Sequence, residues 1–179
     1  MEELLWTGEL KEIFFRLGAA VLIGGILGIN RELRHKPAGM RTHALVALGA
    51  ALITLIAVQL SPKGIAVDGT IVVRAIQGVI TGIGFLGGGV ILRSQDQRMV
   101  RGLTTAASIW VVAALGVACG VGFWQMALIA MGLSLIVLIV GEPLEYFLHQ
   151  ILPEHEENEL EKPVEGKKQS LTHLQPPTS

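Results

Sequence analysis

Apolar residues are gathered into five long runs along the chain, and charged residues lie almost entirely between and beyond these runs. Each run is close to the ~20 residues that an α-helix needs to cross the hydrocarbon core of a bilayer. A bilayer offers no water to backbone groups, so segments of this kind must be helical. The pattern predicts an all-α polytopic membrane protein with about five transmembrane helices, at residues 13–29, 44–60, 71–92, 103–119 and 123–140.

Composition agrees with a membrane protein. Of the 179 residues, 51% are hydrophobic and 16% are charged, whereas soluble domains carry roughly 25% charged residues. The net charge of −1 provides no basic field, so nucleic acid is not an expected partner. Residues 1–12 hold four glutamates and one lysine. A secretory signal begins with a positive region, so we expect the first helix to be retained.

The basic residues predict the orientation of the helices. They concentrate in the first and third loops, and cytoplasmic loops are the ones enriched in Lys and Arg. We therefore expect both loops to be cytoplasmic, with the N-terminus outside and the C-terminus inside. The residues are Arg31, Arg34, Lys36 and Arg41 in the first loop, and Arg93, Arg98 and Arg101 in the third.

Three parts follow from this pattern: a periplasmic segment at residues 1–12, a transmembrane domain at 13–141 and a cytoplasmic tail at 142–179. The start of the tail is expected to extend the last helix as far as Leu148 and Ile151. Beyond Pro153 the tail is rich in Glu, Lys, Pro and Gln. Such a segment has too little apolar surface to offset the entropy of ordering, so we expect it to be largely disordered.

Glycines in the third run spell GxGxxG, the pattern of a dinucleotide-binding loop, at Gly82, Gly84 and Gly87. That motif needs a preceding soluble strand, and here it lies inside a membrane span. Close helix packing through small residues is the favoured interpretation. The alternative is a helix break at residues 87–89 that lines a cavity, as in transporters. The predicted packing residues are Gly24, Gly28, Gly78, Gly82, Gly84 and Gly88.

Ionisable residues are nearly absent from the five runs. No Asp or Glu lies within any of them, and Mg²⁺ sites use oxygen ligands that include one or two carboxylates. The single cysteine, Cys119, excludes an intrachain disulfide. We predict no catalytic residue, no cofactor, no metal site and no enzymatic activity.

The densest polar chemistry lies at the predicted cytoplasmic face, around the first loop and the start of the fourth helix. Thr42 is expected to cap the second helix through its hydroxyl. Topology and attraction to anionic lipids would also account for the arginines, and hydroxyls can bond back to their own helix. The alternative is a cluster that binds a ligand or a partner, made of Arg31, Glu32, Arg41, Thr42, Thr104 and Thr105.

Three segments make the chain resemble the MgtC/SapB family of bacterial inner-membrane proteins. They are NREL…KPAGMRTHALVALGAAL, GVITGIGFLGGGVIL and RGLTTAASIWVVAALGVACGVGFW, in the order expected for the family. The resemblance covers residues 18–140. It implies a five-helix protein of the inner (plasma) membrane with a role in growth at low magnesium. Larger members carry a soluble domain after the membrane part, whereas only a short tail follows here.

The resemblance also implies a regulator of another membrane complex, such as the ATP synthase. The lack of carboxylates within the runs independently favours a regulator that acts through helix–helix contacts. A transporter or channel for Mg²⁺ or another ion is the alternative. The expected partners are the lipid bilayer and another membrane protein, and self-complementary glycine faces make a homodimer an alternative.

Overall fold

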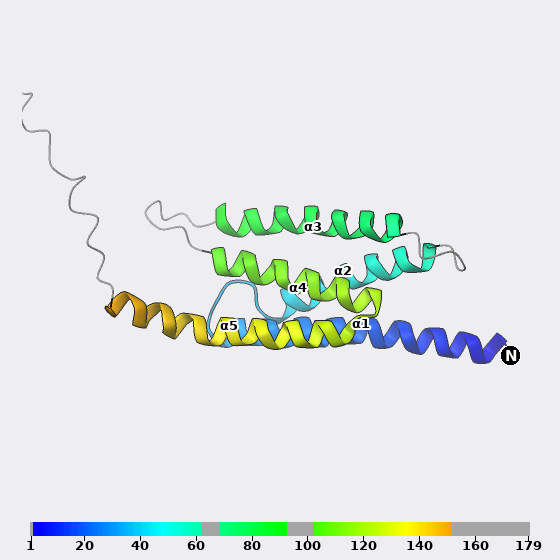
Figure 1. The fold of residues 1–179 in the computed structure, drawn as a ribbon, viewed down its shortest axis with the longest axis horizontal. Coiled ribbons are helices and arrows are strands. Elements are labelled where there is room, and N and C mark those ends of the chain that lie inside the picture. The colour runs from blue at the N-terminus through cyan, green and yellow to red at the C-terminus, as the bar shows by residue number, and fades with distance from the viewer. Residues whose placement is uncertain (1, 62–68, 93–101, 152–179) are drawn as a thin grey trace, which may run out of the picture. The chain divides into compact units, whose positions relative to one another are not determined.

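The computed structural model describes residues 2–61, 69–92 and 102–151, and all regular structure in these ranges is helical. The five predicted helices are confirmed (Figure 1). The first and last are longer than their apolar runs, because polar residues continue both helices. The bounds are α1 Glu2–Leu33, α2 Met40–Leu60, α3 Gly69–Leu92, α4 Leu103–Val121 and α5 Trp124–Ile151.

The chain divides into two compact units, residues 1–138 and 139–179, and α5 runs across the boundary. In the second unit the described part is the end of α5, where Pro143 lies inside the helix and Tyr146 and Phe147 are exposed. The extension predicted through Leu148 and Ile151 is thus present. The tail predicted to be disordered lies outside the described residues, and so do Arg93, Arg98 and Arg101 of the third loop.

The first unit is built around α1, α2 and α4, which pack against one another, while α3 packs against α2 and α4 (Figure 1). Many buried positions carry small residues. Helices in lipid gain little from the hydrophobic effect, so their association depends on close packing that small side chains allow. One buried cluster comprises Ala20, Ile23, Leu27, Ala47, Ala51, Val112, Leu115, Cys119 and Ala127. The other comprises Ala50, Val79, Ile83, Ile109 and Ala113.

Two pairs of glycines let α2 approach both of its main neighbours. A Cβ atom at Gly28 of α1 would lie 2.5 Å from Met40 Cα, and one at Gly24 would lie 2.6 Å from the His43 carbonyl oxygen. On α4, a Cβ atom at Gly116 would lie 2.3 Å from the Ala47 oxygen, and one at Gly120 would lie 2.4 Å from the Ala51 oxygen. Gly24 and Gly28 therefore face α2.

The glycines of α3 have a different environment. A Cβ atom at Gly78, Gly82, Gly84 or Gly88 would meet no atom within 4 Å. These four positions therefore leave open space along α3, and their predicted packing role stays a prediction. The helix is continuous from Gly69 to Leu92, so residues 87–89 do not interrupt it.

A left-handed residue ends α1. His35 has φ 53°, its N–H donates to the Glu32 oxygen at 3.0 Å, and the Lys36 N–H donates to the Arg31 oxygen at 3.0 Å. This is a Schellman motif, in which glycine usually occupies the left-handed position.

His35→Gly is expected to stabilise the protein by about 1 kcal/mol, because the left-handed conformation disfavours a residue with a Cβ atom by about that amount. Thermal unfolding in detergent micelles would measure the gain. Lys36→Gly is the control, since Lys36 does not have positive φ, and it should bring no stabilisation. Equal effects of the two substitutions would contradict the proposed strain at His35.

The start of α2 corrects one prediction. Thr42 was expected to cap this helix, but α2 begins at Met40 with Gly39 as its N-cap, and no cap side chain bonds there. The Glu32 carboxylate of α1 instead accepts the Met40 N–H at 3.0 Å. A Cβ atom at Gly39 would lie 2.8 Å from Glu32 Oε2, so glycine leaves room for the carboxylate. A negative charge at a helix N-terminus is stabilised by the helix dipole.

Candidate functional site

Arg31 is a buried charged residue of the first unit. It lies in the last turn of α1, is 2% exposed, and donates from Nη2 to the hydroxyl of Thr105 in the first turn of α4. Hydrogen bonds that involve a charged group are stronger than neutral ones. Arg31 therefore ties the end of α1 to the start of α4.

His43 joins α2 to the same place and is fully buried. Its Nδ1 lies 3.1 Å from the Gly39 carbonyl oxygen, and its Nε2 lies 3.2 Å from the Ser108 hydroxyl oxygen. A carbonyl oxygen only accepts, so Nδ1 must carry a proton, and in the neutral ring Nε2 is left as an acceptor. Ser108 Oγ also lies 2.8 Å from the Thr105 carbonyl oxygen, and its single hydroxyl proton can be donated either to that oxygen or to His43 Nε2, but not to both.

We call Arg31, His43, Thr105 and Ser108 the buried polar cluster. Its members come from three helices and meet at the end of the bundle where α1 ends and α2 and α4 begin. We call this the Arg31 end. Polar groups that are satisfied across helices in lipid hold those helices in one arrangement.

The structure separates the six predicted site residues into two groups. Arg31 and Thr105 bond to each other in the buried polar cluster, and Glu32 caps α2 beside it. The side chains of Arg41, Thr42 and Thr104 are exposed. Thr104 lines a cavity of about 290 Å³ between α1, α4 and α5, together with Ser108 and Ser134. That the six residues form one cluster that binds a ligand or a partner stays a prediction.

Two members of the cluster, His43 and Ser108, were not among the predicted site residues. One signal for them was present in the sequence. His43 is a polar residue next to a long apolar run, and polar groups within a span usually face protein. Their meeting depends on the packing of α2 against α4, which no local pattern reveals.

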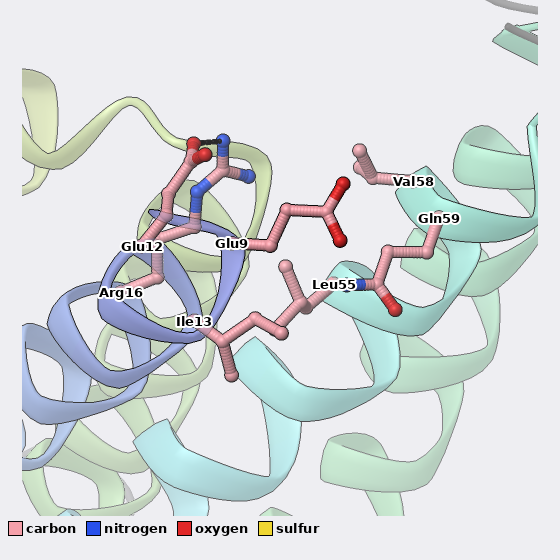
Figure 2. A pocket seen from close by; sticks show the side chains of 7 residues that line it. All are labelled: Glu9, Glu12, Ile13, Arg16, Leu55, Val58 and Gln59. Atoms are coloured by element: carbon pink, nitrogen blue, oxygen red, sulfur yellow. Dashed lines mark hydrogen bonds and ion pairs between the residues drawn. The ribbon is translucent and has the colours of Figure 1, made fainter. Parts of the chain in front are cut away.

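The opposite end of the bundle, which we call the Arg16 end, holds a hollow of about 390 Å³ (Figure 2). Arg16 stands on one side of it and forms an ion pair with Glu12 on the same helix. The full lining is Glu9, Glu12, Ile13, Arg16, Leu55, Val58 and Gln59.

Arg16 also completes the end of α4. Its Nη1 lies 2.9 Å from the Gly120 oxygen and 3.1 Å from the Val121 oxygen. The two preceding carbonyls, of Ala118 and Cys119, accept the N–H groups of Phe123 and Gly122. The last four carbonyls of a helix have no partner within it, and here each has one.

Arg16→Gln is expected to destabilise the bundle by about 1.5–3 kcal/mol, the range for hydrogen bonds to a charged group. The side chain is 17% exposed, so solvent screening weakens these bonds only in part. Thermal unfolding in detergent would measure the loss. Lys11→Gln, at an exposed cation on the same helix, is the control. An Arg16 variant as stable as this control would show that the helix end needs no cap.

The five helices are long and apolar enough to cross a membrane, with spans of 27, 21, 23, 19 and 25 residues. They define the chain as a multi-pass helical membrane protein. Among the described residues no group of three or more His, Cys, Asp or Glu side chains could hold a metal ion.

Residues 17–147 match the model of the MgtC family, and the chain belongs to that family. The resemblance drawn from its motifs is thereby confirmed. The chain is 41% identical over 137 residues to the protein SrpB of Synechococcus elongatus, which covers 73% of this chain and 75% of SrpB. No solved structure matches it.

Two further relatives are longer than the matched region. Identity is 36% to the protein SapB of Bacillus subtilis, covering 80% of this chain and 61% of SapB. Identity is 39% to the protein MgtC of Salmonella choleraesuis, covering 86% of this chain and 58% of MgtC. The chain thus spans about three-fifths of these two relatives. Family membership supports a membrane protein related to magnesium limitation.

Proposed function

We propose that the protein is a regulator in the bacterial inner membrane that acts on a larger membrane complex, such as the ATP synthase, under magnesium limitation. The observation that carries this proposal is the open space along α3 at Gly78, Gly82, Gly84 and Gly88. Small residues on a lipid-facing helix surface allow another helix to approach its backbone closely.

Two further observations support a regulator over an ion carrier. Helix α3 is continuous across residues 87–89, and α2, α3 and α4 contain no Asp or Glu. Conduction of Mg²⁺ requires oxygen ligands along the path, and carboxylates are the strongest of these in proteins. The buried polar cluster bonds within the bundle, so it serves the arrangement of α1, α2 and α4.

The test combines rescue and flux. A deletion strain at low magnesium should regain growth with the wild-type protein and lose it with Gly82→Leu, whose side chain would fill the hollow of about 380 Å³ that Gly78 and Gly82 line beside α2. Gly132→Leu, at a glycine of α5 where a Cβ atom would also meet nothing within 4 Å, is the control and should rescue. Full rescue by Gly82→Leu would contradict a contact on this face.

Flux separates the regulator from the alternative, an Mg²⁺ transporter or channel. Purified protein in liposomes under a membrane potential is expected to pass no more Mg²⁺ than empty liposomes. Flux above that background would overturn the regulator and establish the transporter.

A further inference from the structure

The outward face of α3 carries a polar seam. Arg74, Gln77, Thr81, Gly84 and Gly88 follow one another at alternating spacings of three and four residues, which places them in one line along a helix. The first four are exposed and Gly88 is half-buried. The opposite face of α3, with Val79 and Ile83, is the one that packs against Ile109 and Ala113 of α4.

Polar side chains on a lipid-facing surface are costly. Neither the Arg74 side chain nor the Gln77 side chain has a hydrogen bond or ion pair to any part of the chain that the structure describes. Thr81 differs, because its hydroxyl donates to the Gln77 carbonyl oxygen at 2.8 Å. The two longest side chains of the seam thus have bonding capacity that the bundle leaves unused.

Depth distinguishes the two residues. At 1.5 Å per residue, Arg74 lies roughly 8 Å and Gln77 roughly 12 Å along the axis from the start of α3 at Gly69. A long arginine can extend toward the interface from its position. The shorter glutamine amide lies deeper, where a hydrogen-bonding partner on another helix is the favourable solution.

We infer that the seam is the docking site for a transmembrane helix of another membrane protein that carries a carboxylate at the depth of Arg74. The carboxylate would pair with the guanidinium of Arg74. A polar group one turn deeper on the partner helix would form a hydrogen bond with the Gln77 amide. At Gly84 and Gly88 the absent side chains allow the two backbones to approach. Val73, Ile80 and Phe85, all exposed and apolar, flank the seam. This inference rests on the proposed function and specifies its partner.

Charge disfavours a second copy of this chain as the occupant. Copies of one membrane protein share one orientation, so a two-fold contact along the seam would bring Arg74 opposite its own counterpart. Like charges placed together repel, most strongly where the dielectric constant is low. A carboxylate at that position is attracted instead.

Model helices in liposomes provide the test. Three tryptophan-free peptides of Leu, Ala and Gly would each carry a Ser one turn deeper for the Gln77 amide. They would differ only at one position, about one and a half turns from one end, which carries Asp, Asn or Lys. Each has a dansyl label that accepts energy from the tryptophans of the full-length protein. The Asp peptide is expected to associate about three- to thirtyfold more tightly than the Lys peptide, the range of polar contacts between membrane helices. Arg74→Gln should remove the preference for Asp over Asn, and Gln77→Leu should weaken binding of both.

A matched control separates pairing from simple anchoring at the interface. Val73→Arg combined with Arg74→Val keeps composition and depth but turns the guanidinium by about 100° around the helix. Loss of the Asp preference in this variant supports the seam. Retention of the preference there, or equal binding of the Asp and Lys peptides by the wild type, would overturn it.

Energy transfer between two labelled copies of the protein, abolished by Gln77→Leu, would overturn the heterologous partner in favour of a homodimer. Growth rescue and flux are independent of the peptides. One combination of results would reject the docking site but keep the regulator. In it, Gly82→Leu abolishes rescue, no Mg²⁺ flux occurs, and the peptides bind with no preference for Asp. If flux appears, the regulator fails whatever the peptides do.

Discussion

Gly116→Ala is expected to destabilise the bundle by about 2–4 kcal/mol, in the upper part of the usual range for overpacking or above it. The added Cβ atom would lie 2.3 Å from the Ala47 carbonyl oxygen and 2.9 Å from its Cα atom. Both are backbone atoms, so no side-chain rotation relieves the overlap, and α4 must separate from α2. Titration with a denaturing detergent, followed by tryptophan fluorescence, would measure the loss.

Gly84→Ala is the matched control, because a Cβ atom at Gly84 meets nothing within 4 Å. It is expected to leave stability unchanged or to raise it by up to about 1 kcal/mol through helix propensity. Equal losses in the two variants would mean that α2 and α4 are not held together at Gly116.

Thr105→Val is expected to destabilise the protein by about 2–3 kcal/mol, the upper range for a hydrogen bond to a charged group. The substitution keeps the shape of the side chain but removes the hydroxyl that accepts from Arg31, whose side chain is 2% exposed. Removing one partner of a buried charge is more damaging than replacing both.

Two neighbouring substitutions make this prediction specific. Thr105→Ser retains an acceptor and should recover most of the stability, while Thr104→Val, at the exposed adjacent position, should have little effect. The same unfolding measurement applies to all three variants. Similar values for Thr104→Val and Thr105→Val would show that the bond to Arg31 contributes nothing.

The five helices could be predicted because each requires only a local pattern. An apolar run long enough to cross a bilayer must be helical, and the predicted ends at Leu60, Leu92 and Leu103 agree with the structure. The ends of α1 could not be predicted, because polar residues continue this helix beyond the span, whereas the extension of α5 to Ile151 was predicted. Orientation in the membrane stays a prediction.

The contacts between helices were less accessible to sequence reasoning. Gly24 and Gly28 resemble Gly78 and Gly82 in sequence, yet the first pair faces the backbone of α2 and the second pair faces open space. The spacing of glycines shows that a helix has a face of small residues, but it does not show which other helix packs against that face. The prediction that Thr42 caps α2 was wrong for a related reason. Thr42 is a good local candidate, but Glu32 reaches Met40 from another helix.

Helix α1 supplies bonding groups to segments that the ribosome makes later. Glu32 serves the first turn of α2, Arg31 serves Thr105, and Arg16 serves the last carbonyls of α4. A nascent chain that has released only α1 and α2 into the bilayer therefore exposes Arg31 before its threonine acceptor exists. Arg31 gains this acceptor only when α4 has been synthesised. A message cut short before residue 105 would yield a product in which this bond is never made.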